Sequence, residues 1–160
     1  MKKYIYYFFT FFLLSACGNS KYSVGNSIED KALSAALKQL DKNPIDTVIQ
    51  NQVKILYNDA AVTHLNNIEK YESSSEITKW DKIIKEYEIL QKTTNVIMSS
   101  KNAISLINPS SFATEIETTK EKAANELYNN GISLLNNADG NKQNYRDAYF
   151  SFQKANELRF

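Results

Sequence analysis

Two side chains of this chain are of types that support catalysis or metal binding: the only histidine, His64, and the only cysteine, Cys17. His64 lies in no HExxH arrangement, and the sequence has no GxSxG, P-loop or GxGxxG motif. A single histidine in a helical pattern is far more often a packed or surface residue than a metal ligand or general base. We therefore predict a non-enzymatic protein with no catalytic residue, no metal and no cofactor.

Charged side chains gather in two stretches, and both patterns are typical of solvent-exposed helix faces. In the first, lysines are interleaved with glutamates, which favours a solvated face over a catalytic acid pair. In the second, three lysines occur at helical spacing. We expect them to lie on the exposed side of the helix, opposite its apolar face, and we do not expect them to form a nucleic-acid-binding patch. The first group is Glu115, Glu117, Lys120, Glu121, Lys122 and Glu126, and the second is Lys79, Lys82 and Lys85.

The sequence before Cys17 has the layout of a secretory signal peptide. Lysines at positions 2 and 3 precede an apolar run over 4–14, and the small residues Ser15 and Ala16 follow. A helix needs about 20 apolar residues to span a bilayer, so this run is too short for a permanent anchor. We predict that residues 1–16 are a cleaved signal.

The four residues Leu14, Ser15, Ala16 and Cys17 resemble the lipobox of bacterial lipoprotein signal peptides. The resemblance implies cleavage between Ala16 and Cys17, lipidation of the Cys17 thiol, and acylation of the new amino terminus by a fatty acid such as palmitate. The membrane would then be a partner through this lipid. In enteric bacteria an aspartate after the cysteine retains lipoproteins at the inner membrane. Gly18 at that position favours the outer membrane as the location in the cell envelope.

Composition divides the mature chain into a short tether and one domain. Residues 17–26 are rich in glycine, serine and asparagine, and we expect a lipidated flexible tether there. Residues 27–160 have the size of one small domain. Cleavage removes two of the nineteen basic residues and none of the eighteen acidic ones, so the mature net charge is −1 by formal count. This balance argues against a nucleic-acid partner.

Apolar residues recur at helical spacing, and no stretch of the mature chain shows the alternation of a β-strand. We predict an all-α fold with helices over 28–40, 45–71, 76–93, 112–136 and 144–158, and less regular structure over 96–108. Ser27 is expected to cap the first helix, and Asn43 is a candidate cap for the second. The apolar stripe of the second helix is predicted to comprise Ile45, Val48, Ile49, Val53, Leu56, Ala60, Leu65 and Ile68.

Two pairs of predicted helices carry related sequences. The first helix of each pair contains a similar string, Leu-Tyr-Asn-Asp-Ala at 56–60 and Leu-Tyr-Asn-Asn-Gly at 127–131. The second helices have the same three spacings between four key residues, and Ile83 and Leu90 stand where the other helix has small residues. The four residues are Trp80, Ile83, Tyr87 and Leu90 in one helix and Tyr145, Ala148, Phe152 and Ala155 in the other.

The second pair resembles a tetratricopeptide repeat over about 124–158. In that family a small residue in the first helix and an Ala-x3-Phe-x2-Ala run in the second let the helices pack closely. Here these positions are taken by Gly131, Ala148, Phe152 and Ala155. The loop at 139–144 is longer than usual, no proline closes the second helix, and the first pair is only repeat-like.

The resemblance implies helical hairpins stacked as a short solenoid over 27–160. Small outer-membrane lipoproteins in which a divergent hairpin precedes one repeat unit are similar. Solenoid ends need a polar capping helix, and none precedes the last residue, Phe160. We therefore expect either that something else covers the last helix or that the sequence is truncated.

These features predict a membrane-anchored cell-envelope lipoprotein whose helical domain is a scaffold for protein–protein interaction, with an unidentified envelope protein as partner. The alternative is a small-ligand or glycan-binding accessory lipoprotein of a transport system. That alternative requires an exposed aromatic pocket, whereas aromatic residues at helical spacing usually belong to a core. We expect core positions for Trp80, Tyr87, Tyr128, Tyr149 and Phe152.

Overall fold

A computed structural model describes residues 21–159, and all regular secondary structure in this range is helical. The prediction of an all-α fold is confirmed. No helix in the described range is both long enough and apolar enough to cross a membrane. The helices are α1 (Ile28–Lys42), α2 (Thr47–Glu72), α3 (Lys79–Ser99), α4 (Lys101–Ile104), α5 (Ala113–Asn136) and α6 (Lys142–Glu157).

Side-chain caps set the boundaries of α1 and α2. Ser27 caps α1 as predicted, because its Oγ accepts a hydrogen bond from the Asp30 N–H and the Asp30 carboxylate accepts one from the Ser27 N–H, each at 3.0 Å. Asn43 does not start α2 but ends α1. The cap of α2 is Asp46, whose Oδ1 accepts from the Val48 N–H at 2.9 Å. This helix therefore begins later than predicted, at Thr47.

Within the segment over 96–108, residues 96–104 belong to two helices separated by one serine, and residues 105–108 form no helix. α3 continues past the predicted end at 93 and reaches Ser99. Ser100 then caps the short α4, with its Oγ accepting from the Ala103 N–H at 3.2 Å. Serine is a poor residue inside a helix but a good one at its N-cap, which explains both the weak helical pattern and the observed break.

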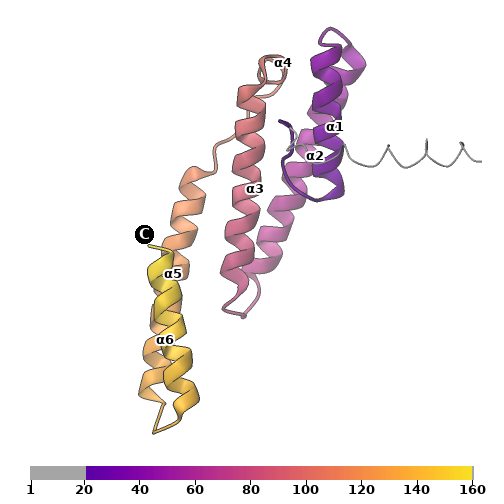
Figure 1. Cartoon of the computed structure of the whole chain (residues 1–160). Helices are drawn as coiled ribbons and strands as arrows, with labels where there is room; N and C mark the ends of the chain where they lie inside the picture. The colour runs from indigo at the N-terminus through magenta and orange to yellow at the C-terminus, as the bar shows by residue number, and fades with distance from the viewer. Residues whose placement is uncertain (1–20, 160) are drawn as a thin grey trace, which may run out of the picture.

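The helices form an antiparallel group of three with a hairpin attached to its side (Figure 1). α1 packs on α2, and α2 packs on α3. α5 lies along α3 and pairs with α6, and this hairpin extends beyond the turn between α2 and α3. α5 thus joins the two parts of the fold.

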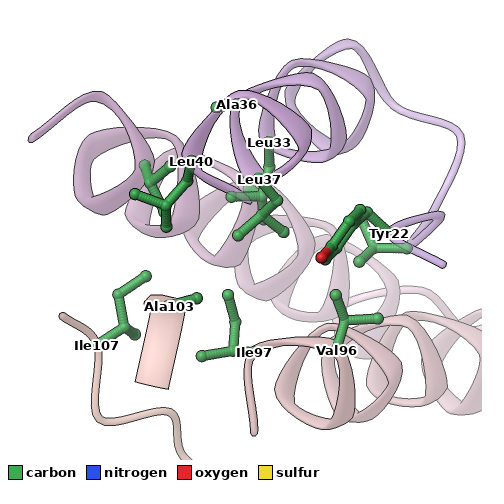
Figure 2. Packing of buried hydrophobic residues seen from close by; sticks show 12 residues of the cluster. Tyr22, Leu33, Ala36, Leu37, Leu40, Val96, Ile97, Ala103 and Ile107 are labelled. Atoms are coloured by element: carbon green, nitrogen blue, oxygen red, sulfur yellow. The ribbon is translucent and has the colours of Figure 1, made fainter. Parts of the chain in front are cut away.

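The main hydrophobic core lies between α1, α2, the last turns of α3, and α4 with the residues that follow it. Figure 2 shows the α1 side chains Leu37 and Leu40 facing Ile97, Ala103 and Ile107. All five are buried. Fully burying a leucine or isoleucine side chain contributes about 1.5–3 kcal/mol, and with twelve buried members this cluster is larger than the other two described clusters.

The predicted tether is only partly free of the domain. Residues 21–26 form no helix or strand, as their composition indicates, but Tyr22 and Val24 are buried in the main core. The Tyr22 hydroxyl also hydrogen-bonds to Asp41 at the end of α1. The expectation of a flexible tether is therefore wrong for residues 21–26, and residues 17–20 lie outside the described range.

Two smaller hydrophobic clusters lie outside the main core, one between α2 and α3 and one between α5 and α6. In one, Ile68, Ile83 and Leu90 are covered by Trp80 and Tyr87, among others. In the other, α5 and α6 enclose a small group that Ile77, just before α3, helps to cover. Trp80 and Tyr87, which were predicted to occupy a core, are partly buried and pack against the first of these clusters.

Not every apolar residue predicted to be buried is covered. Tyr128 and Tyr149 are exposed, the latter to 65% of its surface. The stripe predicted for the second helix includes three exposed residues, namely Val48 and Leu65 of α2 and Ile45, which lies before the helix begins. The predictions for these residues are wrong. For Val48 and Leu65 the reason is that α2 carries apolar residues on two sides and only one side contacts other helices.

Candidate functional site

His64 is the centre of a buried ionic cluster that links three helices. It lies in α2 and is only 3% exposed. Its Nε2 is 3.0 Å from Asp30 Oδ1 on α1, and its Nδ1 hydrogen-bonds to Glu86 Oε2 on α3. Asp30 is completely buried, and the Glu86 side chain is largely so. Of the two roles predicted for His64, packed or surface residue, the structure selects the packed one.

The geometry fits a protonated imidazole between two ionised carboxylates. A carboxylate only accepts hydrogen bonds, so both ring nitrogens of His64 must carry a proton to satisfy both partners. Burial by itself lowers the pKa of His64, but the hydrogen bonds to Asp30 and Glu86 outweigh it and raise this pKa above its ordinary value. Burial raises the pKa of Asp30, but the bonds from His64 and Ser27 outweigh that effect and lower it.

The remaining carboxylate oxygens of the cluster also have partners. Glu86 Oε1 accepts from Asn67 Nδ2 at 3.3 Å, and Asp30 Oδ2 accepts from the Ser27 N–H. Gly25 closes the cluster from the side of the amino-terminal segment. A Cβ at Gly25 would collide with the Asp30 carboxylate and lie 2.9 Å from Ile89 Cγ2, so this backbone approach requires glycine.

This closed arrangement suits a structural role. Both ring nitrogens of His64 are bonded to carboxylates, so neither is available to activate a nucleophile. Within residues 21–159 no group of three histidine, cysteine or acidic residues is placed to hold a metal ion. Asp30, His64 and Glu86 are far apart in the sequence, and no local sequence motif predicts that they meet. The cluster acts as an internal clamp on α1, α2 and α3.

A second candidate site lies on the α5–α6 hairpin, where the repeat-like residues meet. Ala148 and Ala155 are buried, and Gly131 contacts the ring of Phe152. A Cβ at Gly131 would lie 2.7 Å from Phe152 Cε1. The two helices therefore approach closely at this point.

The outer side of this hairpin presents an aromatic face, which we define as Tyr128 of α5 with Tyr145, Tyr149 and Phe152 of α6. The three α6 residues follow one another at helical spacing and share one side of the helix. The rings of Tyr128 and Phe152 are 5.4 Å apart. Beside them is a hollow of about 430 Å³ that Ala155, Asn156 and Arg159 also line.

The charged stretches are arranged differently from each other. Glu117 and Lys120 form an exposed ion pair at 3.3 Å, in accord with a solvated face. Lys79, however, is mostly buried between α3 and α5, 3.9 Å from Glu126 Oε2 and 5.0 Å above the Trp80 ring. The prediction of an exposed lysine stripe is therefore wrong at Lys79.

The lipobox residues Leu14, Ser15, Ala16 and Cys17 lie outside the described range. Comparison with protein-family models, curated proteins and solved structures finds no match to this chain. The chemistry of its own residues therefore has to indicate its function.

Proposed function

We propose that this chain is a lipid-anchored protein of the bacterial cell envelope that binds another envelope protein through the aromatic face of its α5–α6 hairpin. The observation that carries the proposal is the exposure of Tyr128, Tyr145 and Tyr149 on one hairpin, with an apolar hollow next to Tyr128. The lipobox residues around Cys17 support the anchor. The outer membrane is the expected location.

Aromatic side chains favour protein contacts for a physical reason. They bury a large apolar area with few rotatable bonds, and the tyrosine hydroxyl keeps a hydrogen-bonding group at the edge. Asn156 and Arg159 provide polar groups beside the hollow. This combination of an aromatic centre and a polar rim is typical of surfaces that bind a helical segment.

The binding proposal is tested by site-specific photo-cross-linking in intact envelopes. A photoreactive amino acid replaces Tyr149 in the full chain, and Lys101 of α4 is replaced in a control. We expect one discrete cross-linked protein from position 149 and not from position 101, and loss of this product when Tyr145→Ala is added. Equal products from both positions, or none from position 149, would contradict the proposal.

The anchor is tested separately by the intact mass of the protein from membranes, compared with Cys17→Ala. We expect a mature chain that begins at Cys17 and carries a diacylglycerol and an acyl chain, and we expect the variant to lack both. An uncleaved or unmodified wild-type protein would remove the anchor from the proposal. The cross-linking result would not depend on it.

A further inference from the structure

The side of α2 that faces away from the protein carries a row of exposed aliphatic residues. We call this row the α2 outer face and define it as Val48, Ile55, Val62 and Leu65. Their exposed fractions lie between 43% and 72%. The opposite side of α2 supplies buried residues to the cores, including Val53 and Ile68. α2 is therefore an amphipathic helix with a second apolar stripe that no described residue covers.

The spacing of this row is that of a coiled-coil seam. Val48, Ile55 and Val62 are seven residues apart, which places them at the same position of successive heptads. Taking this as position a, the d positions are Asn51, Asn58 and Leu65, and all six residues are exposed. β-Branched residues at position a favour two-stranded coiled coils.

We propose that the α2 outer face binds the same face of a second copy of this chain, with the two α2 helices parallel and in register. In a parallel pair, a residues meet a residues and d residues meet d residues. Ile55 then packs on Ile55 of the second copy, and Asn58 hydrogen-bonds to its own counterpart. An antiparallel pair in full overlap would place Ile55 and Val62 against asparagines and keep an aliphatic contact only between Val48 and Leu65, so it loses the Ile55 pair and the asparagine pairs.

Charge complementarity supports the same orientation. Lys54 and Asp59 flank the seam at heptad positions g and e. In parallel coiled coils a g residue meets the e residue five positions later on the other helix. Lys54 of each copy thus meets Asp59 of the other, which gives two ion pairs. Both residues are exposed, and neither is part of an ion pair within residues 21–159.

The seam is short, so the dimer is expected to be weak in dilute solution. From Val48 to Leu65 it extends over roughly 26 Å, at 1.5 Å per residue. The next a position is Glu69, which would meet a second Glu69 and so end the contact. Anchoring in a membrane would raise the effective concentration. A parallel pair places both amino-terminal segments at the same end of the dimer, which is compatible with two lipid anchors in one membrane. The proposed dimer does not depend on the anchor.

Disulfide cross-linking of the full chain in membranes tests the proposal. Ile55→Cys places a thiol in the seam, and Lys38→Cys places one on the exposed side of α1 as the matched control. Wild type under the same oxidant reports on Cys17 alone, so a free Cys17 thiol would count against the proposed lipidation and not against the dimer. We expect an oxidant-dependent dimer for Ile55→Cys and none for Lys38→Cys.

A charge exchange then tests the orientation. Adding Asp59→Lys to Ile55→Cys turns both ion pairs into repulsive pairs, and we expect the cross-linked fraction to fall about fivefold. Adding Lys54→Glu as well restores attraction and should restore the cross-link. If Ile55→Cys gives no cross-linked dimer, the proposal is overturned. This holds also if the Cys thiol is shielded from water-soluble reagents, because a membrane or another protein then covers the α2 outer face. Failure of the second exchange to restore the cross-link would overturn the parallel register.

Discussion

At the scale of single residues, His64 shows how a buried charge becomes tolerable. The imidazolium donates to two carboxylates from two other helices, so each of these largely buried charged groups has a partner. Removing one member of such a cluster destabilises a protein more than replacing the whole cluster with apolar residues, because the remaining charges stay buried without a partner. The cluster therefore makes the relative positions of three helices depend on one side chain.

Replacing His64 with leucine is expected to lower the free energy of unfolding by about 3–5 kcal/mol. Leucine fills similar space but cannot donate a hydrogen bond to Asp30 or Glu86. Urea unfolding at pH 6 measures the change. Lys70→Leu, an exposed substitution on the same helix, is the control and should change stability by less than about 0.5 kcal/mol. Equal stability of the two variants would contradict the clamp.

Trp80 distinguishes a core residue from a ligand-binding residue. It packs in the cluster of Ile68, Ile83 and Leu90, and its ring also lies under Lys79. Trp80→Ala is therefore expected to cost about 3–5 kcal/mol of stability, measured by chemical denaturation. A variant that is as stable as wild type would instead favour the ligand- or glycan-binding alternative.

At the scale of elements, the α5–α6 hairpin depends on the close approach of Gly131 to Phe152. Two effects of Gly131→Ala oppose each other. Alanine favours a helix over glycine by about 1 kcal/mol, but its Cβ would crowd the Phe152 ring, and overpacking costs about 1–3 kcal/mol. Because the ring is also held by Tyr128, we expect a net loss of about 1 kcal/mol in thermal or urea unfolding.

Making Gly131→Ala in the Phe152→Leu variant separates the gain in helix propensity from the crowding of the ring. In Phe152→Leu the crowding is relieved, so adding Gly131→Ala should be neutral or stabilising. The two substitutions should thus be non-additive by about 1 kcal/mol or more, as expected for residues in contact. Additive effects would mean that Gly131 and Phe152 do not pack against each other in solution.

At the scale of the whole molecule, the clamp makes stability depend on pH in two directions. The raised pKa of His64 means that its contribution is complete below about pH 6.5, its ordinary value, and is lost as pH rises through the raised value. The lowered pKa of Asp30 means that its contribution is complete above its ordinary value of 3.8 and is lost as pH falls through the lowered value.

We therefore expect the free energy of unfolding to be highest between about pH 4 and 6.5 and to decline on the alkaline side. Above the raised pKa, neutral His64 has one N–H, and one carboxylate then faces a lone pair. Each unit by which the pKa is raised corresponds to about 1.4 kcal/mol. Urea unfolding at several pH values between 5 and 9 measures the decline. His64→Leu should lack it, and an unchanged slope in that variant would assign the effect elsewhere.

The sequence by itself determined the helices and the all-α class, because these follow from local interactions. Apolar spacing locates the long helices, and Ser27 with Asp30 marks the start of α1 within four residues. Boundaries failed where two chemical roles compete. Asn43 is suited to either end of a helix, and only the geometry of the chain shows that it ends α1 while Asp46 begins α2.

Tertiary structure alone decided which apolar faces are covered and which charges meet. α2 has aliphatic residues on two sides, and its sequence does not show which side α1 and α3 occupy. Tyr22 and Val24 are buried because α1 to α4 form a surface for them, not because of their neighbours in sequence. Asp30, His64 and Glu86 come from three helices. Burial and ion pairing depend on distance in space, and local sequence patterns contain no such distance.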